Sequence, residues 1–339
     1  MTTRTLPNGP DGGGRCVFLT GATGFIGKRL AAALAARGDR LRCLVRDTRA
    51  AHDLEVMGAQ LIQGDITDDT ALQYGLDHAD LAYHLAAIFD FGRVDAGAME
   101  RVNVDGSRAF LLVAQSMGVP RLVYVSSTAA LVPAVDGEPE DTRESDGPYP
   151  SIYHRTKAHA HRIARKAQQR GLPLIIACPA AVYGPGERGP NGRLIVDLIR
   201  RRVPALFTNP GWYSYVHVDD VVRALVALGE RGAIGETYVL SGEATSINDF
   251  AERVASEAGV RAPPLRLPAP LIRATAAVLD PISRLTRLRF PINRESVETS
   301  TYRWVHAHTR ATRDLDWTPR SLEDGLPETV AWYKDSLKK

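Results

Sequence analysis

Short apolar runs alternate with helical segments through the first half of this chain, and this alternation limits the folds open to it. The runs are RCVFLT, RLRCLVR, AQLIQGDI, DLAYHLAA, RLVYVSS and LPLIIACP. Apolar runs of this length separated by helices are typical of parallel strands that are covered on both faces. The sequence therefore predicts an α/β fold with a doubly wound parallel sheet.

The second half of the chain has a looser pattern. From about Pro185, stretches rich in Gly, Pro and Arg lead to helical segments such as NDFAERVASEAG. With 339 residues, 44% of them hydrophobic, the chain can bury one large core and a smaller one. We expect a disordered tail over 1–14 and a main domain over 15–184 that also takes in about 213–230. The rest of 185–335 is expected to form a smaller C-terminal α/β domain.

Charge and cysteine usage argue against several function classes. The net charge is +3 and no block of Lys and Arg is interleaved with aromatic residues, so we expect no nucleic-acid partner. Cys16, Cys43 and Cys178 lie in separate apolar runs, which suggests reduced thiols, and the sequence shows no metal-ligand spacing. No run reaches the roughly 18 apolar residues of a membrane span. We predict a cytoplasmic protein without a metal site or an integral membrane segment.

Three glycines follow the first apolar run. Gly21, Gly24 and Gly27 in TGATGFIG stand between a predicted strand and the helical segment KRLAAALAARG. Free backbone N–H groups and the helix dipole at such a helix start favour a pyrophosphate. A tight turn without a ligand is the alternative. We interpret the loop as part of a dinucleotide site.

The end of the second apolar run indicates which dinucleotide binds. An acidic residue there would bind both ribose hydroxyls and repel a 2′-phosphate. Val45 holds that position, and the guanidinium of Arg46 can bind a phosphate. This favours NADP(H), although Asp47 keeps NAD possible. Asp65, at the end of a later run, either binds the adenine edge or is a plain turn residue.

Tyr153 and Lys157 form the pair with the clearest chemistry. They stand four residues apart in YHRTK, so a helix places them on one face. Making a tyrosine a base near pH 7 requires lowering its pKa by about 3 units, or roughly 4 kcal/mol. An ammonium about 4 Å away, at an effective dielectric constant of about 20, supplies energy of that order. We expect Lys157 to favour the Tyr153 phenolate, as a base for hydride chemistry.

Taken together, these motifs occur in the order and spacing of a known superfamily. TGATGFIG, GDI, HLAA, NVDGS, VSST, YHRTK, PAAVYGPG and YVHVDDV resemble the extended short-chain dehydrogenase/reductases over about 15–335. The resemblance implies a Rossmann-type domain and a nicotinamide cofactor. It also implies a triad in which Thr128 holds the substrate oxygen, Tyr153 transfers the proton and Lys157 orients the ribose. Ser126 and Ser127 are expected to bond backbone or cofactor instead.

The resemblance also places residues from the glycine loop, the strand ends and two helices around the cofactor. They are Gly21, Thr23, Gly24, Phe25, Ile26, Gly27, Arg46, Asp65, Ile66, Leu85, Ala86, Ala87, Asn103, Tyr153, Lys157, Pro179 and Val182. The smaller C-terminal domain is then the substrate-binding domain.

The expected substrate mouth is aromatic. Nucleotide-sugar epimerases and dehydratases usually carry an Arg shortly before the strand YVHVDD, whereas this chain has Tyr213 there. Trp212, Phe89 and Phe91 add apolar surface. The C-terminal part resembles dihydroflavonol-reductase-like proteins, 3β-hydroxysteroid-dehydrogenase-like proteins and hopanoid-associated epimerases, which implies an apolar or polycyclic alcohol or ketone.

The predicted function is therefore an NADP-dependent oxidoreductase, a ketoreductase in the direction of reduction, acting on a small-molecule substrate. The main alternative is a nucleotide-sugar epimerase or dehydratase with tightly bound NAD(P). A non-catalytic NADP(H)-binding regulator is a further alternative. The resemblance also implies a homodimer through helices at about 100–117 and 151–170. Residues 271–290 form either a helix that covers the pocket or a segment that lies on a membrane.

Overall fold

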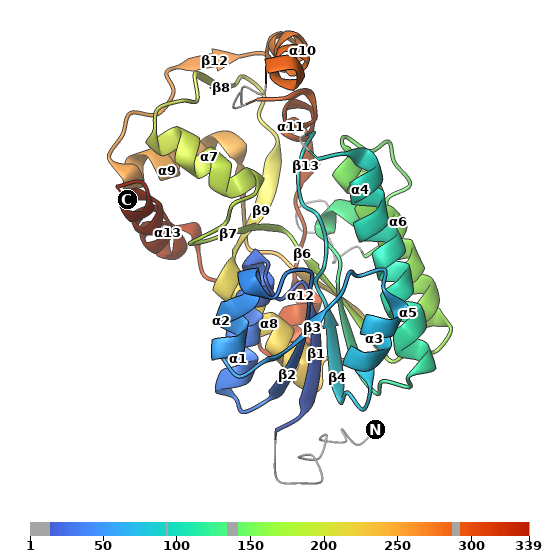
Figure 1. Ribbon diagram of the computed structural model, residues 1–339. Coiled ribbons are helices and arrows are strands. Elements are labelled where there is room, and N and C mark those ends of the chain that lie inside the picture. The colour runs from blue at the N-terminus through green and yellow to red at the C-terminus, as the bar shows by residue number, and fades with distance from the viewer. Residues whose placement is uncertain (1–13, 93, 134–141, 287–291, 339) are drawn as a thin grey trace.

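A seven-stranded parallel sheet forms the centre of the molecule in the computed structural model, which describes residues 14–92, 94–133, 142–286 and 292–338. Its order is β10-β6-β5-β4-β1-β2-β3 (Figure 1). The strands are β1 (Cys16–Thr20), β2 (Arg40–Val45), β3 (Gln60–Gln63), β4 (Leu81–His84), β5 (Leu122–Val125), β6 (Leu174–Pro179) and β10 (Thr237–Leu240). The strand order reverses between β1 and β4, as in Rossmann-type folds. The predicted α/β class is confirmed.

Helices cover both faces of this sheet because its strands are apolar on both sides. Val17 and Leu19 of β1 belong to one buried cluster, and Phe18 between them belongs to the other. The first face carries α1 (Phe25–Ala36), α2 (His52–Val56), α8 (Val218–Arg231) and α12 (Thr309–Leu315). The second carries α3 (Asp69–Leu76), α5 (Gly106–Ser116) and α6 (Ile152–Gln169). Both layers leave the carboxyl ends of the strands uncovered.

The helix expected at about 100–117 is divided. A short helix, α4 (Ala96–Glu100), leads into a π-helical turn over Arg101–Asp105, and α5 follows. Such turns redirect side chains within a helix and are frequent at functional sites. This one directs Asn103 into the interior, where the side chain is 1% exposed.

The smaller C-terminal part lies beyond the carboxyl ends of the main sheet (Figure 1). β7 (Ala181–Tyr183), β9 (Trp212–His217), β11 (Glu243–Ser246) and β13 (Arg303–Trp304) form its sheet, and β8 (Ala205–Phe207) pairs with β12 (Leu265–Leu267). α7 (Pro190–Ile199), α9 (Ile247–Ala258) and α13 (Leu322–Ser336) pack around a separate apolar core. α8, β10 and α12 lead the chain back to the main sheet, and the sequence pattern did not predict β10 or α12.

The segment 271–290 begins within α10 (Ala269–Thr286), and residues 287–290 lie outside the described part of the chain. Ile272 and Ala276 pack against Val297 of α11 (Arg294–Thr299), whereas Leu271 and Val278 are exposed. Across the described ranges, no helix is both long and apolar enough to cross a membrane. Of the tail expected over 1–14, only Gly14 is described.

Candidate active site

A cavity of about 620 Å³ lies where the carboxyl ends of β1, β4, β5 and β6 meet the C-terminal part. One end, here called the glycine-loop end, is formed by Gly21, Gly24, Phe25, Ile26 and Gly27. The other, here called the aromatic end, includes Phe89, Phe91, His154, Tyr213 and Trp304. Thr128, Tyr153 and Lys157 line the same cavity, so the structure brings the three predicted catalytic residues together.

The glycine-loop end is built by backbone. Gly21 has φ of +72°, and a Cβ there would lie 2.7 Å from the Ala86 nitrogen. A Cβ on Gly27 would overlap the carbonyl oxygen of Gly21. Gly24 is the N-cap of α1 and provides no side-chain bond to the helix start. The start of α1 therefore reaches the cavity with its N–H groups uncapped by a side chain, which fits a dinucleotide pyrophosphate.

Several predicted cofactor residues line the cavity and others do not. Those that line it are Gly21, Gly24, Phe25, Ile26, Gly27, Leu85, Ala87, Tyr153, Lys157, Pro179 and Val182. Those outside it are Thr23, Arg46, Asp65, Ile66, Ala86 and Asn103. Thr23 and Arg46 are exposed, and Ile66 is buried beside Gly106. Asp65 accepts hydrogen bonds from the Thr67 nitrogen (3.2 Å) and hydroxyl (2.9 Å), as a turn residue does.

The Asn103 side chain forms hydrogen bonds with other groups of the protein. Its Oδ1 accepts the Ile88 N–H at 2.7 Å, and its Nδ2 donates to the Ile88 carbonyl and to the Thr156 hydroxyl, both at 3.1 Å. All of these partners are protein groups, so Asn103 holds the segment that carries Phe89 and Phe91 against α6. Asn103 does not line the cavity, and the prediction that it contacts the cofactor stays a prediction.

The Tyr153 hydroxyl is protonated at neutral pH. Burial raises the pKa of Tyr153 to about 12, and a hydrogen bond with the Ser127 hydroxyl lowers it only in part. Burial also lowers the pKa of Lys157 to about 8, and the Lys157 Nζ donates to the Val125 carbonyl at 3.1 Å. Burial of the phenol thus opposes the expected phenolate, and the role of the Tyr153–Lys157 pair as a base stays a prediction. Tyr153 is placed to donate a proton.

The aromatic end surrounds the Tyr153 ring. The ring centroid of Phe89 lies 4.8 Å from that of Tyr153, and the centroid of Phe91 lies 6.1 Å from it. The Tyr213 hydroxyl donates to the Thr299 carbonyl at 2.5 Å, so this side chain presents its ring to the cavity. Trp212 lies outside, 38% exposed, with the Arg303 guanidinium over its indole. Successive side chains of a strand point to opposite faces, which corrects the placement of Trp212 beside Tyr213 at the mouth.

Sequence reasoning missed Glu187. Its buried carboxylate accepts hydrogen bonds from the Gly189 and Gly192 nitrogens at the start of α7, and burial raises its pKa. Glu187 lines the cavity, so the start of α7 carries a carboxylate of the chain itself. An acidic residue just ahead of a helix whose first residue is Pro190 is a recognisable signal of this arrangement.

Sequence reasoning also gave no role to His154 or Trp304, and it left Ser127 without a substrate-side role. All three line the cavity. His154 follows Tyr153 directly, and an aromatic or polar residue beside the proposed proton donor is the signal that was available. Nothing in the sequence points to Trp304, because β13 reaches the cavity only through its pairing with β9.

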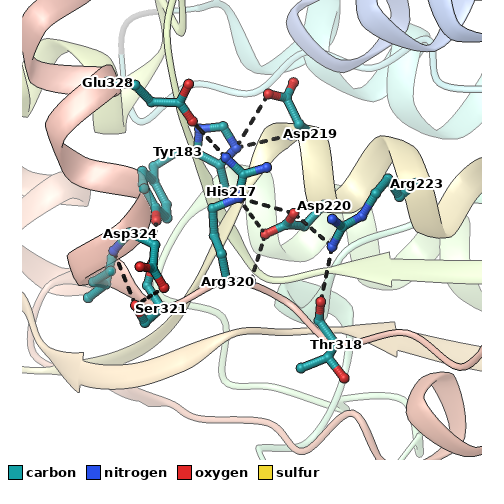
Figure 2. Close-up of polar contacts among 12 residues, drawn as sticks. Tyr183, His217, Asp219, Asp220, Arg223, Thr318, Arg320, Ser321, Asp324 and Glu328 are labelled. Atoms are coloured by element: carbon teal, nitrogen blue, oxygen red, sulfur yellow. Dashed lines mark hydrogen bonds and ion pairs between the residues drawn. The ribbon is translucent and has the colours of Figure 1, made fainter.

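A second polar cluster lies between β9, α8 and α13 (Figure 2). The buried His217 imidazole faces Glu328 at 3.2 Å and Asp219 at 3.7 Å, and ligand atoms of the three lie within 4.8 Å of one another. Both carboxylates already have guanidinium partners, since Arg320 binds Glu328 at 2.6 Å and Arg29 binds Asp219 at 3.1 Å. These guanidinium groups disfavour a metal ion electrostatically. The ion pairs of the cluster instead connect the main domain to the C-terminal part.

Comparisons with known proteins agree with this geometry. The model of the NAD dependent epimerase/dehydratase family matches residues 17–241. "Sterol demethylase protein B" of Methylococcus capsulatus is 29% identical over 323 residues, covering 94% of this chain and 98% of that protein. A 4-hydroxy-2-methyl-3-oxo-4-farnesyl-3,4-dihydroquinoline-1-oxide ketoreductase of Stigmatella aurantiaca is 31% identical, covering 76% of this chain and 78% of that protein. The solved structure of gox2253 superposes with a TM-score of 0.80 at 31% identity, covering 95% of this chain and 98% of that one.

Proposed function

The chain belongs to the NAD dependent epimerase/dehydratase family, and within it we propose that this enzyme reduces a ketone on an apolar small molecule with NADPH. The observation that carries the proposal is the placement of Thr128, the buried Tyr153 and Lys157 in the wall of one cavity whose other end is aromatic. A ketoreductase is also among the relatives over 30% identical.

The chemistry follows from three side chains on one wall. The nicotinamide, when bound, supplies the hydride. Tyr153 donates its phenolic proton to the carbonyl oxygen, which becomes the hydroxyl of the product. Lys157, with its pKa near 8, is mostly charged at pH 7 and stabilises the phenolate that proton donation leaves. The Thr128 hydroxyl lines the same wall and donates a hydrogen bond to the substrate oxygen.

Two features favour an apolar substrate over a nucleotide sugar. A nucleotide diphosphate needs cations or free N–H groups, and the start of α7 is one place in this cavity wall where a second helix could offer them. Glu187 already occupies those N–H groups with negative charge, which would repel a diphosphate. Tyr213, whose hydroxyl is bonded to the Thr299 carbonyl, presents an apolar ring beside it.

NADP(H) is the proposed cofactor because of the end of β2. Val45 is buried there and Arg46 is exposed, with no ion pair to any residue of the described ranges. The Asp47 carboxylate accepts the Arg49 N–H at 2.9 Å and so is engaged with its own turn. A free cation beside an engaged acid favours a 2′-phosphate. We also propose that the main domain, expected over 15–184 with about 213–230, binds the cofactor and that the rest of 185–335 binds the substrate. The C-terminal part takes β7 and β9 from the expected main-domain ranges, and the main domain takes β10 and α12 from the other.

Epimerisation or dehydration of a nucleotide sugar is the second candidate. The family match and the presence of Arg188 at the cavity wall favour it. The expected homodimer through 100–117 and 151–170 stays a prediction under either function.

Turnover of NADPH with a panel of apolar ketones tests the proposal. We expect one NADPH to be consumed per alcohol formed. Tyr153→Phe should lower kcat at least about 100-fold while NADPH affinity changes little, because only the proton donor is removed. The matched control is Tyr149→Phe, since the Tyr149 hydroxyl donates to the Ser145 carbonyl and Tyr149 does not line the cavity.

Three other results would contradict this function. Conversion of a nucleotide sugar without net NADPH consumption would identify an epimerase or dehydratase. NADPH binding without turnover of any substrate would identify a regulator. Activity of Tyr153→Phe within threefold of the parent would remove Tyr153 from the proposed role.

A further inference from the structure

His154 occupies a fixed position in the cavity wall next to the proposed proton donor. Its side chain is buried, with the whole residue 3% exposed, and it lines the same cavity as Tyr153. The imidazole stacks with Trp304 at 4.6 Å between ring centroids and lies nearly parallel to Phe91 at 6.0 Å. Aromatic neighbours on two sides hold the ring in one orientation.

The hydrogen bonds of Ser151 favour one tautomer of this ring. Ser151 is the buried N-cap of α6, and its Oγ accepts the His154 backbone N–H at 3.3 Å. The same Oγ lies 2.7 Å from Nδ1 of the imidazole. A hydroxyl that already accepts one bond still has a proton to donate, and Nδ1 is the acceptor at hand. With Nδ1 as acceptor, a neutral imidazole carries its proton on Nε2.

The ring stays neutral in the physiological pH range. Burial lowers the pKa of His154 to about 3, and no carboxylate is paired with it. No charged group of the facing elements pairs with the ring: Arg193 is paired with Asp90, and one oxygen of Glu295 accepts the Ile152 N–H while its other oxygen has no partner among the described residues. Nε2 is therefore an N–H donor over the working pH range of most enzymes.

No hydrogen bond of Nε2 to another described residue accompanies the contact of Nδ1 with Ser151, and the imidazole lines the cavity beside the Phe91 ring. Nε2 is not among the buried side-chain atoms that lack a partner, so this N–H group is accessible from the cavity. A ligand oxygen at this point accepts its hydrogen bond. A ligand made of hydrocarbon alone displaces water from the N–H group without replacing that bond, which disfavours such a ligand.

We propose that His154 is a specificity-determining residue whose Nε2–H binds a second oxygen of the substrate. The preferred substrates are then apolar ketones that carry a further carbonyl, hydroxyl or ether oxygen a few bonds from the carbonyl reduced at Tyr153. This inference rests on the proposed function and narrows its substrate class. His154 acts by hydrogen bonding alone, since no covalent bond to it forms or breaks.

A pair of probe ketones tests this role: 2,2-dimethylcyclohexane-1,3-dione and 2,2-dimethylcyclohexanone differ by one oxygen. The readout is the ratio of their kcat/KM values with NADPH, together with the affinity of each ketone for the NADPH complex. His154→Phe keeps the ring stacking and removes the donor. We expect it to lower the dione-to-monoketone ratio about tenfold, mainly through KM of the dione. Dividing the variant's ratio by the parent's cancels the intrinsic reactivity of the two ketones.

Two further variants separate recognition from packing. His154→Gln returns a neutral N–H donor and should recover part of the ratio. His159 lies on the same helix outside the cavity, so His159→Phe should leave the ratio at the parent value. Urea unfolding of each variant shows whether the fold is retained.

A ratio within twofold of the parent in His154→Phe overturns the inference, as does an equal loss for both ketones. If the parent reduces neither ketone, the binding measurement decides, and equal affinity for the two ketones overturns it. Failure of the proposed function looks different, since it is conversion of a nucleotide sugar without net NADPH consumption.

Discussion

The glycine-loop end and the aromatic end of the cavity are built from different materials. Backbone forms the first, and the Cβ positions of Gly21 and Gly27 are already filled by neighbouring main-chain atoms. Side chains form the second, from β4–α4, α6, β9, α11 and β13. Close-packed backbone cannot relax around an added methyl group, whereas a side-chain wall changes shape with each residue.

This difference predicts which substitutions abolish binding and which alter selectivity. A change at the glycine-loop end should remove cofactor binding altogether. A change at the aromatic end should alter the choice of substrate and leave the cofactor bound. Lys157 lies between the two ends, and its effect should appear in the pH dependence of stability.

The largest effect is expected from Gly21→Ala. Its matched control is Gly259→Ala, because Gly259 has φ of +70° and a Cβ there meets no atom within 4 Å. Both variants should lose about 1–2 kcal/mol of unfolding free energy, the cost of a left-handed backbone in a non-glycine residue, and Gly21→Ala should lose more because its methyl group also meets the Leu85–Ala86 backbone. Only Gly21→Ala should weaken NADPH binding, by at least about 100-fold, since only its methyl group meets Ala86. Fluorescence titration with NADPH and urea unfolding measure the two quantities. Equal NADPH affinity of the two variants would contradict the view that backbone atoms shape the glycine-loop end for the cofactor.

A smaller effect on cofactor affinity is expected at the end of β2, beside the glycine-loop end. The double variant Val45→Asp, Arg46→Ala should reverse the preference for NADPH over NADH, because it adds a repulsion and removes an attraction. The charge-assisted contact of Arg46 is worth roughly 1.5–3 kcal/mol, or about 10- to 150-fold in affinity. Titration of both cofactors into parent and variant checks this. Arg40→Ala, at the opposite end of the same strand, serves as control. A parent with equal affinities for NADH and NADPH would show that Arg46 remains in solvent.

The smallest effect is expected from Lys157→Met, at the residue between the two ends of the cavity. Burial lowers its pKa from 10.5 to about 8, so the unfolded chain binds more protons between these values and stability rises with pH. From pH 8 to 9 the free energy of unfolding of the parent should increase by about 1 kcal/mol relative to Lys157→Met. Urea unfolding at both pH values measures this difference. Parallel pH dependence in parent and variant would show that the ammonium is not desolvated.

The sequence predicted those features that depend on neighbours along the chain. Apolar runs of strand length gave the parallel sheet, and the glycines of TGATGFIG gave the turn into α1. The i, i+4 spacing of Tyr153 and Lys157 placed both side chains in one cavity wall. Each of these follows from geometry within a few residues.

The features that the sequence did not predict depend on segments far apart in the chain. Their adjacent positions in the sequence led us to expect both Trp212 and Tyr213 at the mouth. Strand alternation turns only the Tyr213 ring into the cavity, and Trp212 packs against Arg303 outside it. Asn103 bonds Ile88 and Thr156, and Glu187 bonds the start of α7. Local patterns do not reveal such partners.

By itself, then, the sequence determined an α/β fold with a glycine loop, a Tyr-Lys pair and an expected apolar mouth. The tertiary structure decided the burial that raises the pKa of Tyr153 and lowers the pKa of His154, and it decided which residues form the aromatic end. The physical reason is that a pKa and a cavity wall depend on burial and on long-range contacts, which arise only when the sheet and the C-terminal part enclose these side chains. Backbone conformation, in contrast, is already constrained by each residue and its near neighbours.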